Sequence, residues 1–92
     1  MSFDDYIAFA EEQAGQRIPT AGRRSHFRVV VQDTRLEFIL DSGKIRQESF
    51  PYVENFCNLY EERGSTRPVD YPETRNASYL IGLARAFEAE EA

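Results

Sequence analysis

Apolar residues recur every three to four positions at the start of the chain, as on one face of a helix. Ser2 is a suitable N-cap, because its hydroxyl can accept a hydrogen bond from the first turn. Gly15 suits the left-handed turn that often follows a helix. We therefore predict a helix over residues 3–14, with an apolar face made of Phe3, Tyr6, Ile7, Ala10 and Ala14.

The middle of the chain alternates between apolar and polar residues, which is typical of strands with one buried face. Residues 16–25 contain Pro19 and Gly22 and are predicted to form a loop. Strands are predicted over residues 26–32 and 35–40, followed after a hairpin turn by a shorter, more polar strand over 44–48. The predicted inward residues are Phe27, Val29, Val31, Leu36, Phe38 and Leu40.

Helical spacing returns in the second half of the chain. Residues 51–63 are predicted to form a helix that begins near Pro51, ends before Gly64 and has an apolar stripe. A loop over residues 65–72 leads to a third helix from about 74 to 90. The two apolar stripes are made of Val53, Phe56, Cys57 and Tyr60, and of Leu80, Leu83, Ala84 and Phe87.

The predicted order is α-β-β-β-α-α, which places the chain in the α+β class. Short connections between consecutive strands favour a three-stranded antiparallel meander, and the single apolar face favours helices packed on one face. The length of 92 residues is that of a single domain, residues 1–92.

Composition narrows the class of protein. The hydrophobic share of 41% is enough for a packed core, which argues against a disordered tail. No apolar run approaches the roughly 20 residues that cross a bilayer, so we expect no membrane partner. The first residues are acidic, whereas a secretory signal begins with basic residues. We therefore expect a cytoplasmic protein.

The residues that commonly carry chemistry are sparse. With one cysteine and one histidine, a metal site is not predicted, and Cys57 is expected to be a buried, unreactive thiol. The five glycines are far apart, so neither a dinucleotide fingerprint nor a phosphate-binding loop can be written. We predict no catalytic residues and no cofactor, and hence a protein that is not an enzyme.

Charge is unevenly distributed along a chain whose net charge is −5. Residues 17–49 carry seven basic and four acidic side chains, a local charge of +3, between acidic ends. A small sheet with protruding arginines can contact nucleic acid. The candidate residues for such an interface are Arg24, His26, Arg28, Arg35, Lys44 and Arg46. The competing interpretation is a solvated face, in which Arg28 or Arg46 pairs with Glu37 across the strands.

Two apolar residues are predicted to face away from the core. If the inward assignment holds, Val30 and Ile39 lie on the open face of the sheet. Such a face is suited to contact with another copy of the chain, and small domains often gain stability by oligomerisation. Our leading hypothesis is therefore a non-catalytic, self-associating interaction module that forms a homo-oligomer. A nucleic-acid-binding module is the alternative.

The third candidate site is the loop between the last two helices. Residues 65–79 are rich in hydrogen-bonding groups, and Arg67, Asp70 and Tyr71 are candidates for binding a small ligand. The competing interpretation is a connection tied down by its own hydrogen bonds, because Asp70 and Glu73 stand at capping-box spacing.

The segment Arg67-Pro68-Val69-Asp70-Tyr71 through Asn76-Ala77-Ser78-Tyr79-Leu80 resembles sequences in mobile-element and restriction-associated proteins. The whole chain, acidic and rich in arginine, resembles small orphan α+β proteins carried on bacterial integron gene cassettes. This resemblance implies an origin in bacterial mobile DNA. It implies no activity and no residue roles.

Overall fold

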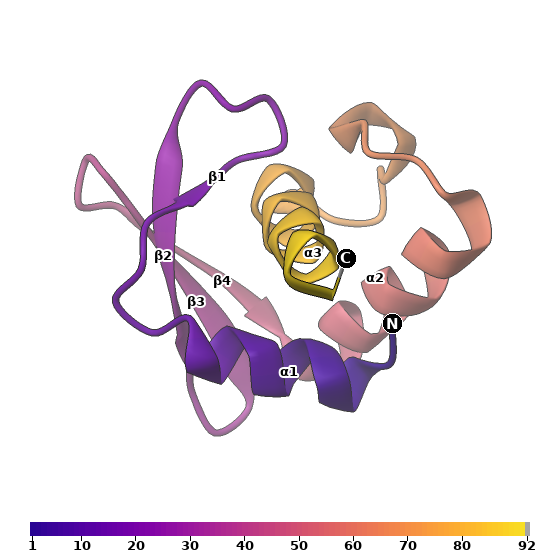
Figure 1. Ribbon diagram of the computed structural model, residues 1–92, viewed down its shortest axis with the longest axis horizontal. Coiled ribbons are helices and arrows are strands. Elements are labelled where there is room, and N and C mark those ends of the chain that lie inside the picture. The colour runs from indigo at the N-terminus through magenta and orange to yellow at the C-terminus, as the bar shows by residue number, and fades with distance from the viewer. Residues whose placement is uncertain (92) are drawn as a thin grey trace.

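The computed structural model describes residues 1–91 of the chain and confirms the α+β class (Figure 1). Three α-helices, four strands and one short 3₁₀ helix follow one another along the chain. They are α1 (Phe3–Glu12), β1 (Ile18–Pro19), β2 (His26–Val31), β3 (Arg35–Leu40), β4 (Ile45–Ser49), α2 (Phe50–Arg63), η1 (Pro68–Asp70) and α3 (Ala77–Glu91).

The four strands form one antiparallel sheet in the order β1-β2-β3-β4. The expected meander of three strands was therefore one strand short, because the predicted loop over residues 16–25 contains β1. Ile18 pairs with Phe27, and the backbone N–H of Thr20 donates to the carbonyl of Ser25 at 3.0 Å. Pro19 is tolerated in β1 because an edge strand does not need every backbone N–H.

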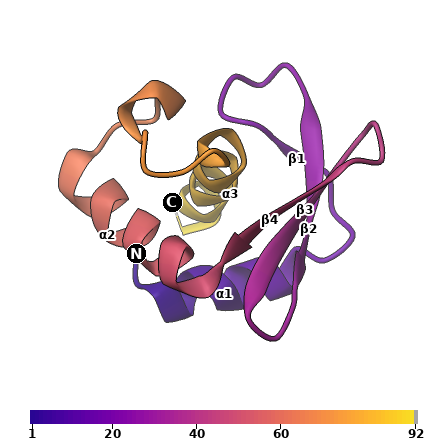
Figure 2. The same cartoon turned by 180° about the vertical axis from the view of Figure 1, so that it is seen from behind.

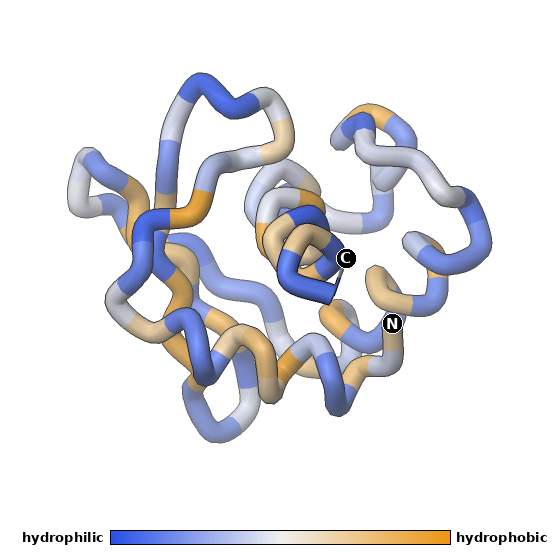
Figure 3. Tube along the Cα trace, in the orientation of Figure 1, coloured by the Kyte–Doolittle hydropathy of each residue, from blue (hydrophilic) through white to orange (hydrophobic). Residues whose placement is uncertain are grey.

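All three helices lie on the same side of the sheet, as Figures 1 and 2 show from opposite directions. The side chains on that face of β2 and β3 include Phe27, Val29, Leu36 and Phe38, all fully buried. Val31 and Leu40, at the strand ends, are half-buried. The predicted inward face is thus confirmed. Hydrophobic segments follow α3 and the central strands, whereas the hairpin tips are hydrophilic (Figure 3).

The helix ends differ from the predicted ones by a few residues. The Ser2 hydroxyl accepts a hydrogen bond from the backbone N–H of Asp5 at 3.1 Å, which confirms the N-cap. α2 ends at Arg63, and the C-cap residue Gly64 has a left-handed φ of 64°, which favours glycine. α3 begins at Ala77, later than expected, because the carbonyl of Asn76 accepts the first helical hydrogen bonds, from Tyr79 and Leu80.

The helix α3 is the centre of the core. Leu80, Ile81 and Leu83 are fully buried between the sheet and the other helices. The hydroxyl of Tyr6 donates to the carbonyl of Leu80 at 2.8 Å and so joins α1 to α3 inside the protein. Cys57 on α2 is buried as expected, and burial raises the pKa of its thiol to about 12.

Gly82 allows α3 to approach the β1–β2 connection closely. A Cβ built at this position would lie 2.4 Å from the carbonyl oxygen of Pro19 and 3.2 Å from the Phe27 ring. The backbone N–H of Ala21 also donates to the carbonyl of Ser78 at 3.0 Å. Helix and connection are therefore in backbone-to-backbone contact, which no larger residue at position 82 could preserve.

We expect Gly82→Ala to destabilise the protein, although alanine is the better helix former by about 1 kcal/mol. The added methyl group overpacks the contact, which should lower the free energy of unfolding in urea by about 1–3 kcal/mol. Gly22→Ala is the matched control, because its Cβ would meet nothing within 4 Å. A Gly82→Ala protein as stable as the parent would contradict the close approach.

Candidate functional site

The open face of the sheet, opposite the helices, is defined by the strand register. Arg28 lies across from Ile39, and Ile39 lies across from Ile45. Directly paired residues share a face, and Val30 lies diagonally next to Ile39. The structure therefore places Val30 and Ile39 together, as the alternation indicated, and adds Ile45 to them. We call these three residues the open-face patch.

Ile45 is the most exposed member of this patch. Its side chain is 55% exposed, whereas Val30 and Ile39 are half-buried. Sequence reasoning missed Ile45 because the third strand was judged by its polar character. The pairing register could have identified Ile45, because a residue that lies across a hairpin from Ile39 must be on the same side of the sheet.

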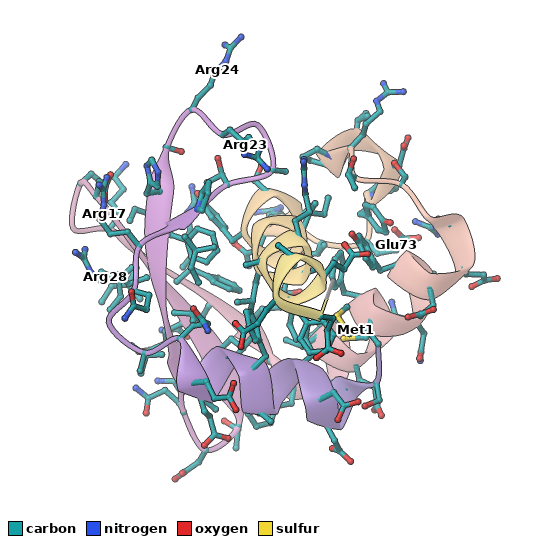
Figure 4. All side chains as sticks on the ribbon, in the orientation of Figure 1. Met1, Arg17, Arg23, Arg24, Arg28 and Glu73 are labelled. Atoms are coloured by element: carbon teal, nitrogen blue, oxygen red, sulfur yellow. The ribbon has the colours of Figure 1, made fainter. Side chains whose placement is uncertain are left out.

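The candidate basic residues do not gather on one face. Arg46 lies across from Phe38, so it is on the helix side of the sheet, opposite to Arg28. Lys44 lies in the turn before β4, and Arg24 lies in the loop before β2 and points away from the body of the protein (Figure 4). His26 is half-buried at the start of β2.

Glu37 is already paired within the sheet. Arg35 donates two hydrogen bonds to it, at 3.1 and 3.3 Å, and Gln32 donates a third at 3.1 Å. These hydrogen bonds lower the pKa of Glu37, and the one from Gln32 has the largest effect. The competing interpretation, in which Arg28 or Arg46 pairs with Glu37, is therefore not what the structure shows, because Glu37 pairs with Arg35. Arg28 instead donates to the carbonyl of Gly15 at 3.3 Å.

The loop after α2 is held by its own hydrogen bonds. Tyr71 is only 1% exposed, and its hydroxyl donates to the carbonyl of Ser65 at 2.7 Å. Asp70 accepts from the hydroxyl of Ser65. Arg67 is exposed. Asp70 and Tyr71 therefore stabilise the loop, and ligand binding by Arg67, Asp70 and Tyr71 stays a prediction.

Arg63 fastens this loop to α2. Its guanidinium donates to both carboxylate oxygens of Glu73, at 2.9 and 2.5 Å, and to the carbonyl of Asp70 at 2.7 Å. The same group lies 5.6 Å from the centre of the Tyr71 ring. The hydrogen bonds from Arg63 lower the pKa of Glu73 from 4.5 to about 2.

A cavity of about 570 Å³ lies between α3 and the β1–β2 connection. Its polar lining includes Arg23 and Thr20 from the connection, Thr66 from the loop after α2, and Arg85 and Glu88 from α3. Sequence reasoning missed this cavity. Arg23 and Arg85 are far apart in the chain, and no local pattern indicates that they line one space.

Comparisons with known proteins give no family: the chain matches no protein-family model, no curated protein and no solved structure. None of the helices within residues 1–91 combines the length and the apolar character that crossing a membrane requires. In the same residues, no three histidine, cysteine, aspartate or glutamate side chains lie together as a metal site would need.

We expect the Arg63–Glu73 pair to contribute stability that depends on pH. Because the pKa of Glu73 is lower in the folded protein, the contribution is present above about pH 4.5 and is lost as the pH falls towards 2. Glu73→Gln should lower the free energy of unfolding at pH 7, and the difference from the parent should shrink as the solution is acidified.

Urea unfolding of both proteins across this pH range measures the effect. Glu54→Gln is the control, since Glu54 is an exposed carboxylate on α2 with no ion pair within residues 1–91. It reports the general result of removing one negative charge. A difference between Glu73→Gln and the parent that stays constant from neutral to acid pH would exclude the pair as its source.

Proposed function

We propose that the protein is a non-catalytic interaction module that associates with further copies of itself through the open face of its sheet. The observation that carries the proposal is Ile45, a branched apolar residue that is 55% exposed on the open face of the edge strand β4, across from Ile39. No helix within residues 1–91 covers this side, since all three pack on the other (Figure 2). Association would remove the open-face patch from water.

A second copy is the partner that suits this face. A two-fold contact brings the same surface patch of each subunit together, so the patch must complement itself. An apolar centre meets this requirement, because two apolar surfaces can pack against each other without opposing like charges. The neighbouring Arg35–Glu37 pair is an internal ion pair, at 3.1 Å, and adds no net charge to the face. Arg28 lies at the edge of the patch, where its head can stay in water.

The free edge of β4 adds a second reason for association. Small domains have exposed strand edges that natural proteins cover or pair. One part of this edge is covered, because the side-chain amide of Asn76 donates to the carbonyl of Gln47 at 2.8 Å and to the carboxylate of Glu48 at 2.6 Å. No helix of the described residues 1–91 covers the open face next to this edge, which supports the face as the contact surface.

Self-association is tested by sedimentation of the whole chain over a range of concentrations. We expect a species larger than the 10.6 kDa monomer, with little dependence on salt. Ile45→Glu should weaken association by about 100-fold or more, because it would bury an unpaired charge in the contact. Val69→Glu is the matched control: Val69 is 68% exposed and lies on η1, away from the sheet.

Two outcomes would overturn the proposal. One is a parent protein that remains a monomer at every concentration. The other is an Ile45→Glu variant that stays folded, by circular dichroism, and keeps the mass of the parent. Equal dissociation of the Val69→Glu variant would also count against the open face, since it would indicate a contact elsewhere.

A nucleic-acid-binding module remains the second proposal, and one observation favours it. Arg24 and Arg28 are exposed and make no ion pair with any residue of the described range 1–91. If they bind phosphates, affinity for random-sequence DNA should fall steeply with salt, because each neutralised phosphate releases counterions. Changing both residues to glutamate should then abolish binding, and Arg75→Glu should not. Salt-independent or absent binding would exclude this function.

Location and origin are part of the same proposal. A lone, buried cysteine suits a reducing compartment, which supports a cytoplasmic protein. The resemblance to bacterial integron cassette proteins supports an origin in mobile DNA.

A further inference from the structure

We propose that the cavity between α3 and the β1–β2 connection binds a small oxyanion, such as the phosphate or carboxylate group of a metabolite, through Arg23 and Arg85. This site is separate from the open face, since it lies on the helix side of the sheet. It is a binding activity in addition to self-association and does not depend on it.

The two arginines make this a site for anions. Both line the cavity, and neither forms an ion pair with a residue of the range 1–91. A guanidinium presents a planar fork of donors that matches the oxygens of phosphate and carboxylate. Thr66 on the same walls carries a hydroxyl that can donate as well, whereas the hydroxyl of Thr20 lies 3.4 Å from that of Ser25 and shares a hydrogen bond with it.

Glu88 is the acidic residue of the cavity wall, and it is already engaged. The hydroxyl of Tyr60 donates to its carboxylate at 2.6 Å. Two arginines against one glutamate leave the wall with a formal charge of +1. A concave surface with a positive excess favours an anionic ligand, even though the net charge of the chain is −5.

The walls of the cavity are held in place before any ligand binds. The contact at Gly82 and the hydrogen bond from Ala21 to Ser78 fix the β1–β2 connection against α3. The backbone N–H of Arg23 donates to the carbonyl of Thr20 at 2.9 Å and closes a tight turn. Binding therefore requires little ordering of the backbone. Flexible sites, in contrast, lose affinity because the ligand must order their loops.

Arg23 is held in a conformation that normally belongs to glycine. Its φ of 60° is left-handed, and among residues 1–91 it is the one non-glycine residue with a positive φ. Such strain is concentrated at functional sites, where the side chain is needed despite its backbone. Figure 4 shows that Arg23 extends towards α3, whereas its neighbour Arg24 points into solvent. The conformation thus directs the guanidinium of Arg23 to the cavity.

The test is a titration of the ¹⁵N-labelled chain with sodium phosphate and, separately, with sodium succinate, at constant ionic strength maintained with sodium chloride. We expect saturable shifts of the amide signals of Thr20, Arg23 and Arg85. Arg85→Gln should weaken binding by about tenfold or more, as expected for the loss of a charge-assisted hydrogen bond. Arg75→Gln, the same change of charge at an exposed arginine outside the cavity lining, should bind like the parent.

A second variant separates binding from folding. Arg23→Gly removes the guanidinium and relieves the backbone, so it should unfold at the same or a higher urea concentration while losing affinity. A stronger response to phosphate assigns a phosphoryl ligand, and a stronger response to succinate assigns a carboxylate. The proposal is overturned if neither anion gives a saturable response, or if Arg75→Gln weakens binding as much as Arg85→Gln.

Discussion

The contact between Gly82 and the backbone of Pro19 is the constraint on which the other parts of the structure depend. A helix that is enclosed by a sheet and two further helices must carry small residues wherever it contacts the main chain of another element. Here α3 meets the β1–β2 connection at Gly82, and it carries the small buried residues Ala77 and Ala84 on its other turns. The contact holds β1 in the sheet, although β1 is only two residues long, and it places Arg23 beside α3.

The buried polar side-chain groups of this small core all have hydrogen-bond partners within residues 1–91, just as its apolar side chains are packed. Within residues 1–91, no buried side-chain nitrogen or oxygen lacks a hydrogen-bond partner. The partners join elements far apart in the chain: Tyr6 reaches Leu80, and Asn76 reaches Gln47. Unpaired buried polar groups are costly, so each of these bonds also excludes other arrangements of the helices. The positions of α1 and β4 relative to α3 follow from them.

Local patterns predicted the three helices, the meander and its inward face, because each rests on a periodicity that neighbouring residues share. They did not predict β1. Its residues are an isoleucine and a proline, and they become a strand only through pairing with Phe27 and His26. The late start of α3 has a similar origin, since the side chain of Asn76 binds β4. The cavity could not be predicted for the same reason, since Arg23 and Arg85 come to line one space only through the tertiary fold.

The central position of α3 has a consequence for how the chain reaches its fold. The hairpins β2–β3 and β3–β4 join neighbouring segments, so they can form early and quickly. The apolar face of that sheet, however, is covered by a helix that follows every other element in the sequence. During synthesis the aromatic side chains of the completed strands therefore stay exposed to water until α3 has left the ribosome. The period of greatest exposure to aggregation is therefore the interval between the synthesis of the strands and the synthesis of α3.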